Sequence, residues 1–120
     1  MHNFRDLEVW TKSMKLCKTF YLSSNNFPQE ELFGLTSQAR RSVISIPSNF
    51  AEGAGRDTNA QFSHFLNIAL GSSFEFETQI LIAKDLQFFK NDDFNIIYSE
   101  IKHIQNMLAK LKQNFNTQTF

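Results

Sequence analysis

One stretch of the sequence has the spacing of a metal-binding helix. Di-metal carboxylate sites in helical bundles use two Glu-x-x-His motifs and two further glutamates, all pointing inward. The sequence has one match, Glu100-Ile101-Lys102-His103, and neither His2 nor His64 belongs to such a motif. Because Ile101 and Ile104 are expected on the buried seam of this helix, His103 should point to solvent and Glu100 should only flank the seam. We therefore expect no metal site and no cofactor.

Two other features could in principle support catalysis or phosphate binding. Gly53-Ala54-Gly55-Arg56 is rich in glycine, but it lacks the Gly-Lys-Ser/Thr ending of a phosphate loop, and a helix precedes it instead of a strand. Helix termination explains these glycines better, although Arg56 stands near the start of the next helix, where an anion could bind. Cys17, the single cysteine, falls on an apolar stripe and should behave as a small hydrophobic residue. The chain is expected not to be an enzyme.

Charged residues on the second and third helices allow two interpretations. Arg40 flanks the apolar stripe of the second helix, and Glu75 and Glu77 flank the stripe of the third. The first interpretation is therefore an ion pair that joins Arg40 to Glu75 or Glu77, within one subunit or between subunits. The second interpretation is a basic patch that contacts the phosphates of RNA or DNA. Its candidate residues are Arg40, Arg41, Arg56, Lys102, Lys110 and Lys112.

Apolar periodicity predicts two long helices in the first half of the chain. The first runs from Arg5 to Ser24, with a stripe of residues at helical spacing, widened by Val9, Leu16 and Phe20. The second covers Leu35 to Glu52 and contains Pro47, which removes the usual partner of the Val43 carbonyl and should kink the helix. Gly53 and Gly55 are expected to end it. The stripe of the first helix comprises Leu7, Trp10, Met14, Cys17 and Tyr21.

Two further helices follow. A third, capped by Asp57 or Thr58, is expected to reach Phe89, a length of about 48 Å at 1.5 Å per residue. The fourth has the cleanest pattern, because its apolar residues alternate at spacings of three and four over three heptads. These seam residues are Phe94, Ile97, Ile101, Ile104, Leu108, Leu111 and Phe115. Four amphipathic helices with short connections predict an all-α, antiparallel up-down four-helix bundle.

Length and composition set further bounds. The 120 residues suit one domain, residues 1–120, and contain only four Gly and two Pro, too few turn-formers for a many-stranded β fold. Twelve basic and twelve acidic residues cancel, which removes the charge repulsion that opposes self-association. The longest apolar run, 80–83, is far below the roughly 18 residues of a membrane span. A single cysteine fits a reducing, cytoplasmic location.

Four ordered motifs resemble a known family. The string from Gly34 to Gly53, GLTSQARRSVISIPSNFAEG, looks like the signature of the four-helix-bundle family of bacterial proteins encoded in 23S rRNA intervening sequences. Residues 4–10 are similar to the family's opening, residues 27–30 to its first connection, and residues 69–79 to its third-helix motif. Phe50 and Phe76 stand where the family usually has Ile or Leu.

The resemblance implies a homo-oligomeric ring, typically a pentamer, without established catalytic residues. A related branch, the accessory variability determinant of diversity-generating retroelements, binds nucleic acid and a reverse transcriptase. By this resemblance we expect a non-catalytic, nucleic-acid-associated accessory protein. The alternative is a scaffold that binds another polypeptide and no nucleic acid.

Overall fold

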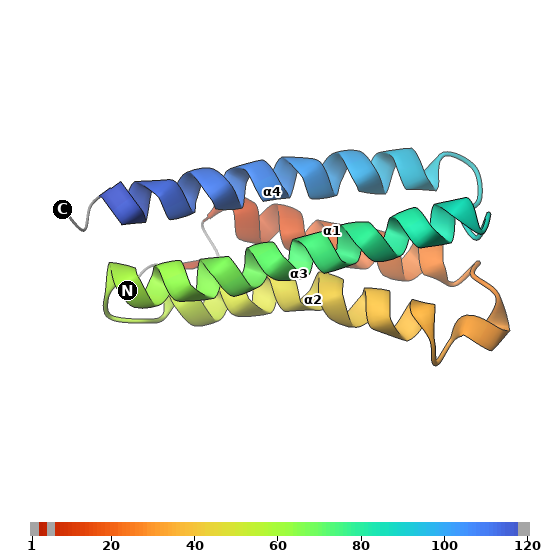
Figure 1. Cartoon of the computed structure of the whole chain (residues 1–120), viewed down its shortest axis with the longest axis horizontal. Helices are drawn as coiled ribbons and strands as arrows, with labels where there is room; N and C mark the ends of the chain where they lie inside the picture. The colour runs from red at the N-terminus through yellow and green to blue at the C-terminus, as the bar shows by residue number, and fades with distance from the viewer. Residues whose placement is uncertain (1–2, 5–6, 118–120) are drawn as a thin grey trace.

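The chain folds into four long helices packed side by side (Figure 1). The computed structural model describes residues 3–4 and 7–117, with side chains through residue 115. The helices are α1 (Glu8–Ser24), α2 (Leu35–Ala54), α3 (Asn59–Asp85) and α4 (Asp93–Thr117), and a short 3-10 turn, η2 (Gln29–Glu31), precedes α2. Each helix packs against the next and α1 also packs against α4, so α2 lies diagonally opposite α4. The predicted all-α, up-down four-helix bundle is confirmed.

The core follows the predicted stripes most closely in α4. Six of its seven predicted seam residues are buried, and Leu111 packs against the core from its edge. The inner side of α2 is formed by Ala39, Val43, Ile46 and Phe50, which are all buried. Within the described ranges, no helix is both long and apolar enough to cross a membrane.

The buried side of α1 differs from the prediction. Val9, Leu16 and Phe20, expected only to widen the stripe, are the hydrophobic residues that α1 buries most deeply. Trp10 is only half-buried and Tyr21 is exposed, and both lie toward the outer edge of the bundle. The helix begins at Glu8, after an extended Leu7, and the predicted start at Arg5 falls outside the described residues. Both stripes have helical spacing, so periodicity alone could not choose between them.

Pro47 lies inside α2, which continues through it to Ala54. Because proline has no N–H, the Val43 carbonyl has no helical donor. The structure places the Cys17 thiol of α1 within 3.3 Å of this oxygen, as a buried hydrogen-bond donor. Cys17 thus joins α1 to α2 at the proline, and the predicted kink itself stays a prediction.

Gly53 has a different role from the one predicted. It lies within α2 and not beyond its end, and no glycine in the described residues has a positive φ. A Cβ built on Gly53 would lie 2.7 Å from the Phe65 Cβ and 2.9 Å from the Phe62 Cδ1. Glycine therefore allows α2 and α3 to approach closely at this level.

The third helix is shorter than predicted. The Thr58 hydroxyl accepts a hydrogen bond from the Gln61 N–H at its start, and the Gln61 side chain accepts one from the Thr58 N–H. At its other end Gln87 has a φ of 63°, and the Phe88 N–H reaches back to the Ala83 carbonyl. This left-handed turn ends the helix four residues before Phe89. It directs Phe88 and Phe89 onto Phe27, with ring centroids 5.7 and 5.0 Å away.

Candidate functional site

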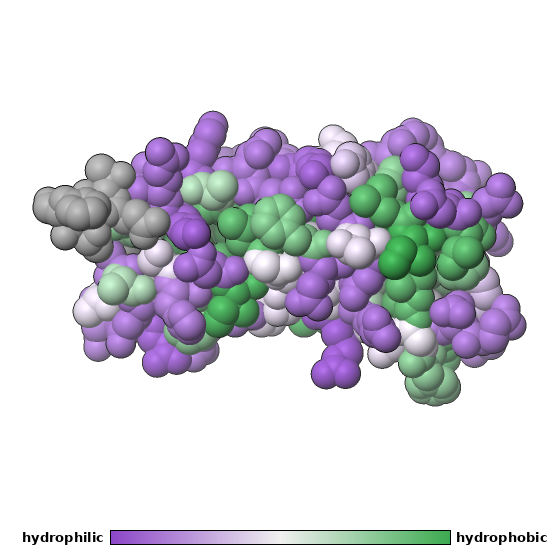
Figure 2. Space-filling model, viewed as in Figure 1, coloured by the Kyte–Doolittle hydropathy of each residue, from purple (hydrophilic) through white to green (hydrophobic). Residues whose placement is uncertain are grey.

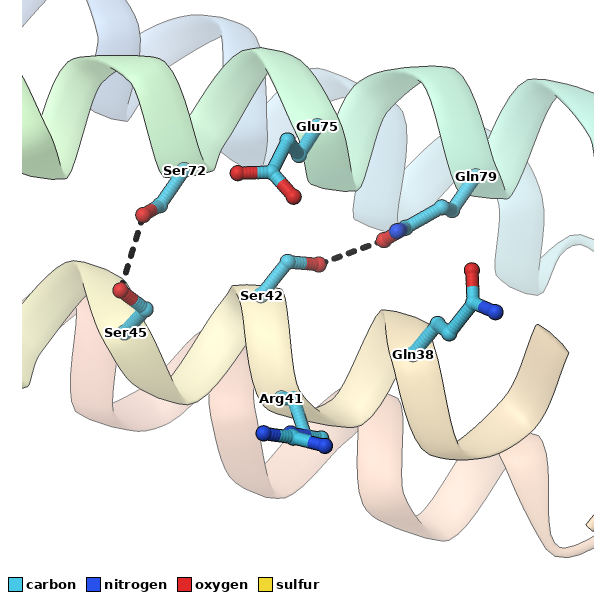
Figure 3. Close-up of a pocket in the computed structure, with 7 residues that line it drawn as sticks. All are labelled: Gln38, Arg41, Ser42, Ser45, Ser72, Glu75 and Gln79. Atoms are coloured by element: carbon cyan, nitrogen blue, oxygen red, sulfur yellow. Dashed lines mark hydrogen bonds between the residues drawn. The ribbon is translucent and has the colours of Figure 1, made fainter. Parts of the chain in front are cut away.

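A polar groove lies between α2 and α3, with a volume of about 490 Å³ (Figure 3). All of its lining residues come from segments 34–53 and 69–79, the two helical segments that carry the family resemblance. The lining residues are Gln38, Arg41, Ser42, Ser45, Ser72, Glu75 and Gln79. The groove is therefore the candidate site for a function that depends on those two segments.

The floor of the groove is already hydrogen-bonded within the protein. The Ser42 hydroxyl donates to the Gln79 Oε1 at 2.5 Å, and the Ser45 and Ser72 hydroxyls lie 2.8 Å apart. The Asn49 amide donates to the Ser45 hydroxyl at 2.8 Å. The first two bonds link α2 to α3, and all three use bonding capacity that a small polar ligand would need.

Two charged residues at the rim of the groove have no such partner. The side chains of Arg41 and Glu75 are exposed, and in the part of the chain that the structure describes neither side chain makes a hydrogen bond or an ion pair. Figure 3 shows Glu75 extending from α3 toward α2, and Arg41 turned away from α3. In that part of the chain, the rim thus carries one free cation and one free anion.

Arg40 lies elsewhere and stabilises the end of α1. Its guanidinium donates to the Ser24 hydroxyl at 2.9 Å, to the Asn25 Oδ1 at 3.1 Å and to the Tyr21 carbonyl at 3.3 Å. It also stacks over the Tyr21 ring, 4.7 Å from the centroid. Since α1 has no basic residue in its last turn, Arg40 supplies the positive charge that a helix C-terminus favours. Within the described chain it pairs with neither Glu75 nor Glu77, and a pair between subunits stays a prediction.

Glu77 joins α3 to α4 in a polar network. Its side chain is 15 % exposed and lies 2.7 Å from the Lys102 Nζ, and it accepts a hydrogen bond from Gln105 at 2.9 Å. Burial acts to raise the pKa of Glu77, but the hydrogen bonds from Lys102 and Gln105 and the charge of Lys102 outweigh it, so this pKa is lowered. The bond to Glu77 raises the pKa of Lys102. Lys102 therefore serves as a partner to Glu77, a role its sequence position did not indicate.

The predicted basic residues do not form one patch in a single chain. Arg56 pairs with Glu52 one turn earlier and lies over the Phe65 ring. Lys110 and Lys112 lie on α4, which does not contact α2. Arg41 and Arg56 both belong to the α2 side but are fifteen residues apart, about 22 Å along a helix.

A different set of lysines lies along the outer side of α1 and at its edge with α4. Lys12 lies 3.9 Å from Glu8, and Glu8 shares a shallow groove with Lys110 of α4. Lys15 is exposed and seven residues after Glu8, so it continues the same side of α1, and Lys18 is exposed one turn later. The spacing of three in Lys12, Lys15 and Lys18 could have revealed this group, which sequence reasoning missed.

The candidate metal and thiol residues are placed as follows. His103 is exposed and Glu100 half-buried, as the α4 seam predicts, and His2 lies outside the described residues. Among the residues that the structure does describe, no three His, Cys, Asp or Glu side chains gather in a way that could hold a metal ion. Burial raises the pKa of the Cys17 thiol to about 11, which keeps it protonated at neutral pH.

Comparison with known proteins agrees with this architecture. A search of the curated proteins finds no match. The chain is similar to a solved structure, that of a protein of unknown function from the S23 ribosomal protein family of Bacteroides thetaiotaomicron. The two sequences are 22% identical, and the structures superpose with a TM-score of 0.80 over 87% of this chain and 97% of that one. At this sequence identity the similarity shows a shared fold. The model of the family described as 23S rRNA-intervening sequence protein matches residues 5–110. The chain therefore belongs to the 23S rRNA-intervening sequence protein family.

Proposed function

We propose that the protein is a non-catalytic, cytoplasmic module that functions as a homo-oligomer. The observation that carries this proposal is the outer surface of α3. Ten large apolar side chains are exposed in the described part of the chain, and α3 with its C-cap carries half of them. These are Ile68, Phe74, Leu81, Ile82 and Leu86.

A helix with apolar residues on its outer as well as its inner side belongs inside a larger structure. The exposed side chains lie on both flanks of α3, because Phe74 and Leu81 are seven residues apart on the flank toward α4, while Ile68 and Ile82 lie on the flank toward α2. Figure 2 shows apolar surface along this face, with a larger patch toward the end where α3 leads into α4. Apolar patches of this kind mark protein–protein contacts, and zero net charge leaves no overall repulsion between copies.

Sedimentation velocity at micromolar concentration tests the proposal. We expect one species several times heavier than the 14.0 kDa chain, and the resemblance to ring-forming relatives makes five copies the expected number. Ile82→Ser should weaken this assembly, whereas Ile96→Ser on α4 is the matched control, since the two isoleucines are 45% and 53% exposed. A monomeric wild-type protein would contradict the proposal.

The lysine group on the α1–α4 edge favours association of this oligomer with nucleic acid. Lys12 and Lys110 lie at the α1–α4 edge, and Lys15 and Lys18 are exposed on α1. Because α1 does not contact α3, assembly through α3 would leave these lysines accessible. Repetition of a modest basic edge in each copy multiplies its contacts with a polyanion. Lys110 and Lys112 remain candidates from the sequence, whereas Arg40, Arg56 and Lys102 already have partners within the protein.

Salt-titrated binding to RNA and to DNA tests this second function. Lys15→Glu with Lys18→Glu should lower affinity and flatten the dependence on salt, because fewer counterions are released. Arg56→Glu serves as the comparison, since Arg56 lies on another edge. Absence of binding at low salt would contradict nucleic-acid association. If the oligomer instead retained another protein, such as a reverse transcriptase, in stoichiometric amount without nucleic acid, the scaffold alternative would be favoured.

A further inference from the structure

A stripe along α3 borders the groove and combines apolar and acidic residues. Ile68, Glu75 and Ile82 are seven residues apart, so they lie on one side of the helix. All three are exposed, and the stripe spans about 21 Å of helix at 1.5 Å per residue. Glu75 therefore stands midway between two exposed isoleucines.

Any partner that covers the two isoleucines also removes Glu75 from water. A carboxylate buried without a partner is strongly unfavourable, whereas a cation with matching hydrogen bonds offsets much of that cost. In the described chain Glu75 has no cation of its own. The partner must therefore bring a positive charge to the centre of an otherwise apolar contact.

The chain itself carries such a charge beside the same groove. Arg41 is exposed on the α2 side of the rim, turned away from α3 and free of partners in the described chain (Figure 3). Its orientation makes it available to another molecule more readily than to Glu75 of its own subunit. A guanidinium also matches a carboxylate better than other cations do, because it can donate two parallel hydrogen bonds.

From this complementarity we infer that a second copy of the chain docks on the α2–α3 groove, with Arg41 of one copy paired to Glu75 of the other. This inference rests on the proposed homo-oligomer and locates its contact. The groove floor supports a protein partner over a small polar ligand, because Ser42, Ser45 and Ser72 already have hydrogen-bond partners. The two isoleucines then supply apolar contact on either side of the ion pair.

Charge reversal tests the pairing. Arg41→Glu and Glu75→Arg each place like charges opposite one another, so each should weaken assembly at least about tenfold in sedimentation equilibrium. The double variant Arg41→Glu/Glu75→Arg should assemble as the wild type does, because the pair is restored in reverse. Circular dichroism of each variant checks that the bundle is folded. Lys90→Glu and Glu30→Arg, at exposed positions outside the groove, are the matched controls and should assemble normally.

A mixture of the two single variants provides a second readout. Differently tagged Arg41→Glu and Glu75→Arg chains should associate with each other more tightly than either does with itself. In every contact between the two kinds of chain, positions 41 and 75 carry opposite charges, whereas in contacts between identical chains they carry like charges. Assembly of both single variants at wild-type strength, or failure of the double variant to recover, would overturn this inference while leaving the proposed oligomer intact. A monomeric wild type would instead remove the proposed function and the inference together.

Discussion

Substitution of Gly53 by alanine tests whether close contact between α2 and α3 determines the stability of the bundle. Gly53 and Gly71 are both helical glycines, but their surroundings differ. A Cβ on Gly53 would lie 2.7 Å from the Phe65 Cβ, 2.9 Å from the Phe62 Cδ1 and 3.3 Å from the Phe62 carbonyl oxygen, whereas a Cβ on Gly71 would meet nothing within 4 Å. The chain thus contains its own control.

The expected effects follow from these distances. Carbon atoms pack best about 3.5–4.0 Å apart, so the closest contact at Gly53 would be short by about 1 Å. Overpacking of this kind costs about 1–3 kcal/mol. Alanine also gains about 1 kcal/mol over glycine inside a helix, and that gain is common to both variants. Gly71→Ala should therefore stabilise the protein, and Gly53→Ala should be about 1–3 kcal/mol less stable than Gly71→Ala.

Urea unfolding followed by circular dichroism measures both free energies of unfolding. Each variant should be measured at two protein concentrations, because a change in assembly makes the midpoint depend on concentration. A Gly53→Ala protein as stable as Gly71→Ala would refute the reasoning, since it would mean that α2 and α3 separate at this level without cost.

Three further predictions concern the pKa values and one turn. The pKa of Glu77 is lowered in the folded protein, so its contribution to stability is present above its unfolded pKa and is lost as the pH falls through the folded pKa. Glu77→Gln should therefore make the free energy of unfolding depend less on pH in the acidic range. An unchanged pH profile would argue against this. Cys17, with a pKa raised to about 11 by burial, should react with iodoacetamide at neutral pH much more slowly in the folded than in the unfolded protein, and equal rates would contradict its burial. Gln87 has a φ of 63°, so Gln87→Gly should raise the unfolding free energy by up to about 1 kcal/mol, whereas a loss of stability would show that the Gln87 side chain contributes more than its backbone strain costs.

The helices and most of the core were predictable because they depend on local spacing. The seam of α4 has one strongly apolar side and no competing one, so its predicted residues are those that the bundle buries. The sequence also predicted that Asp57 or Thr58 caps the start of α3. In the structure the cap is Thr58, which exchanges two hydrogen bonds with Gln61. These features need only the chain within one or two turns of each residue.

The candidate site depended on contacts between distant segments, and the sequence indicated them only in part. The sequence determined that Arg40 flanks an apolar stripe, but the packing of α1 on α2 decided that it binds the end of α1. It determined that Pro47 frees the Val43 carbonyl, but only the position of α1 decided that Cys17 would satisfy it. Local periodicity sets which sides of a helix are apolar, whereas the neighbouring helices set which of those sides is covered. That is why the spare apolar flanks of α3, and the free Arg41 and Glu75 beside them in the described chain, became visible only in the tertiary structure.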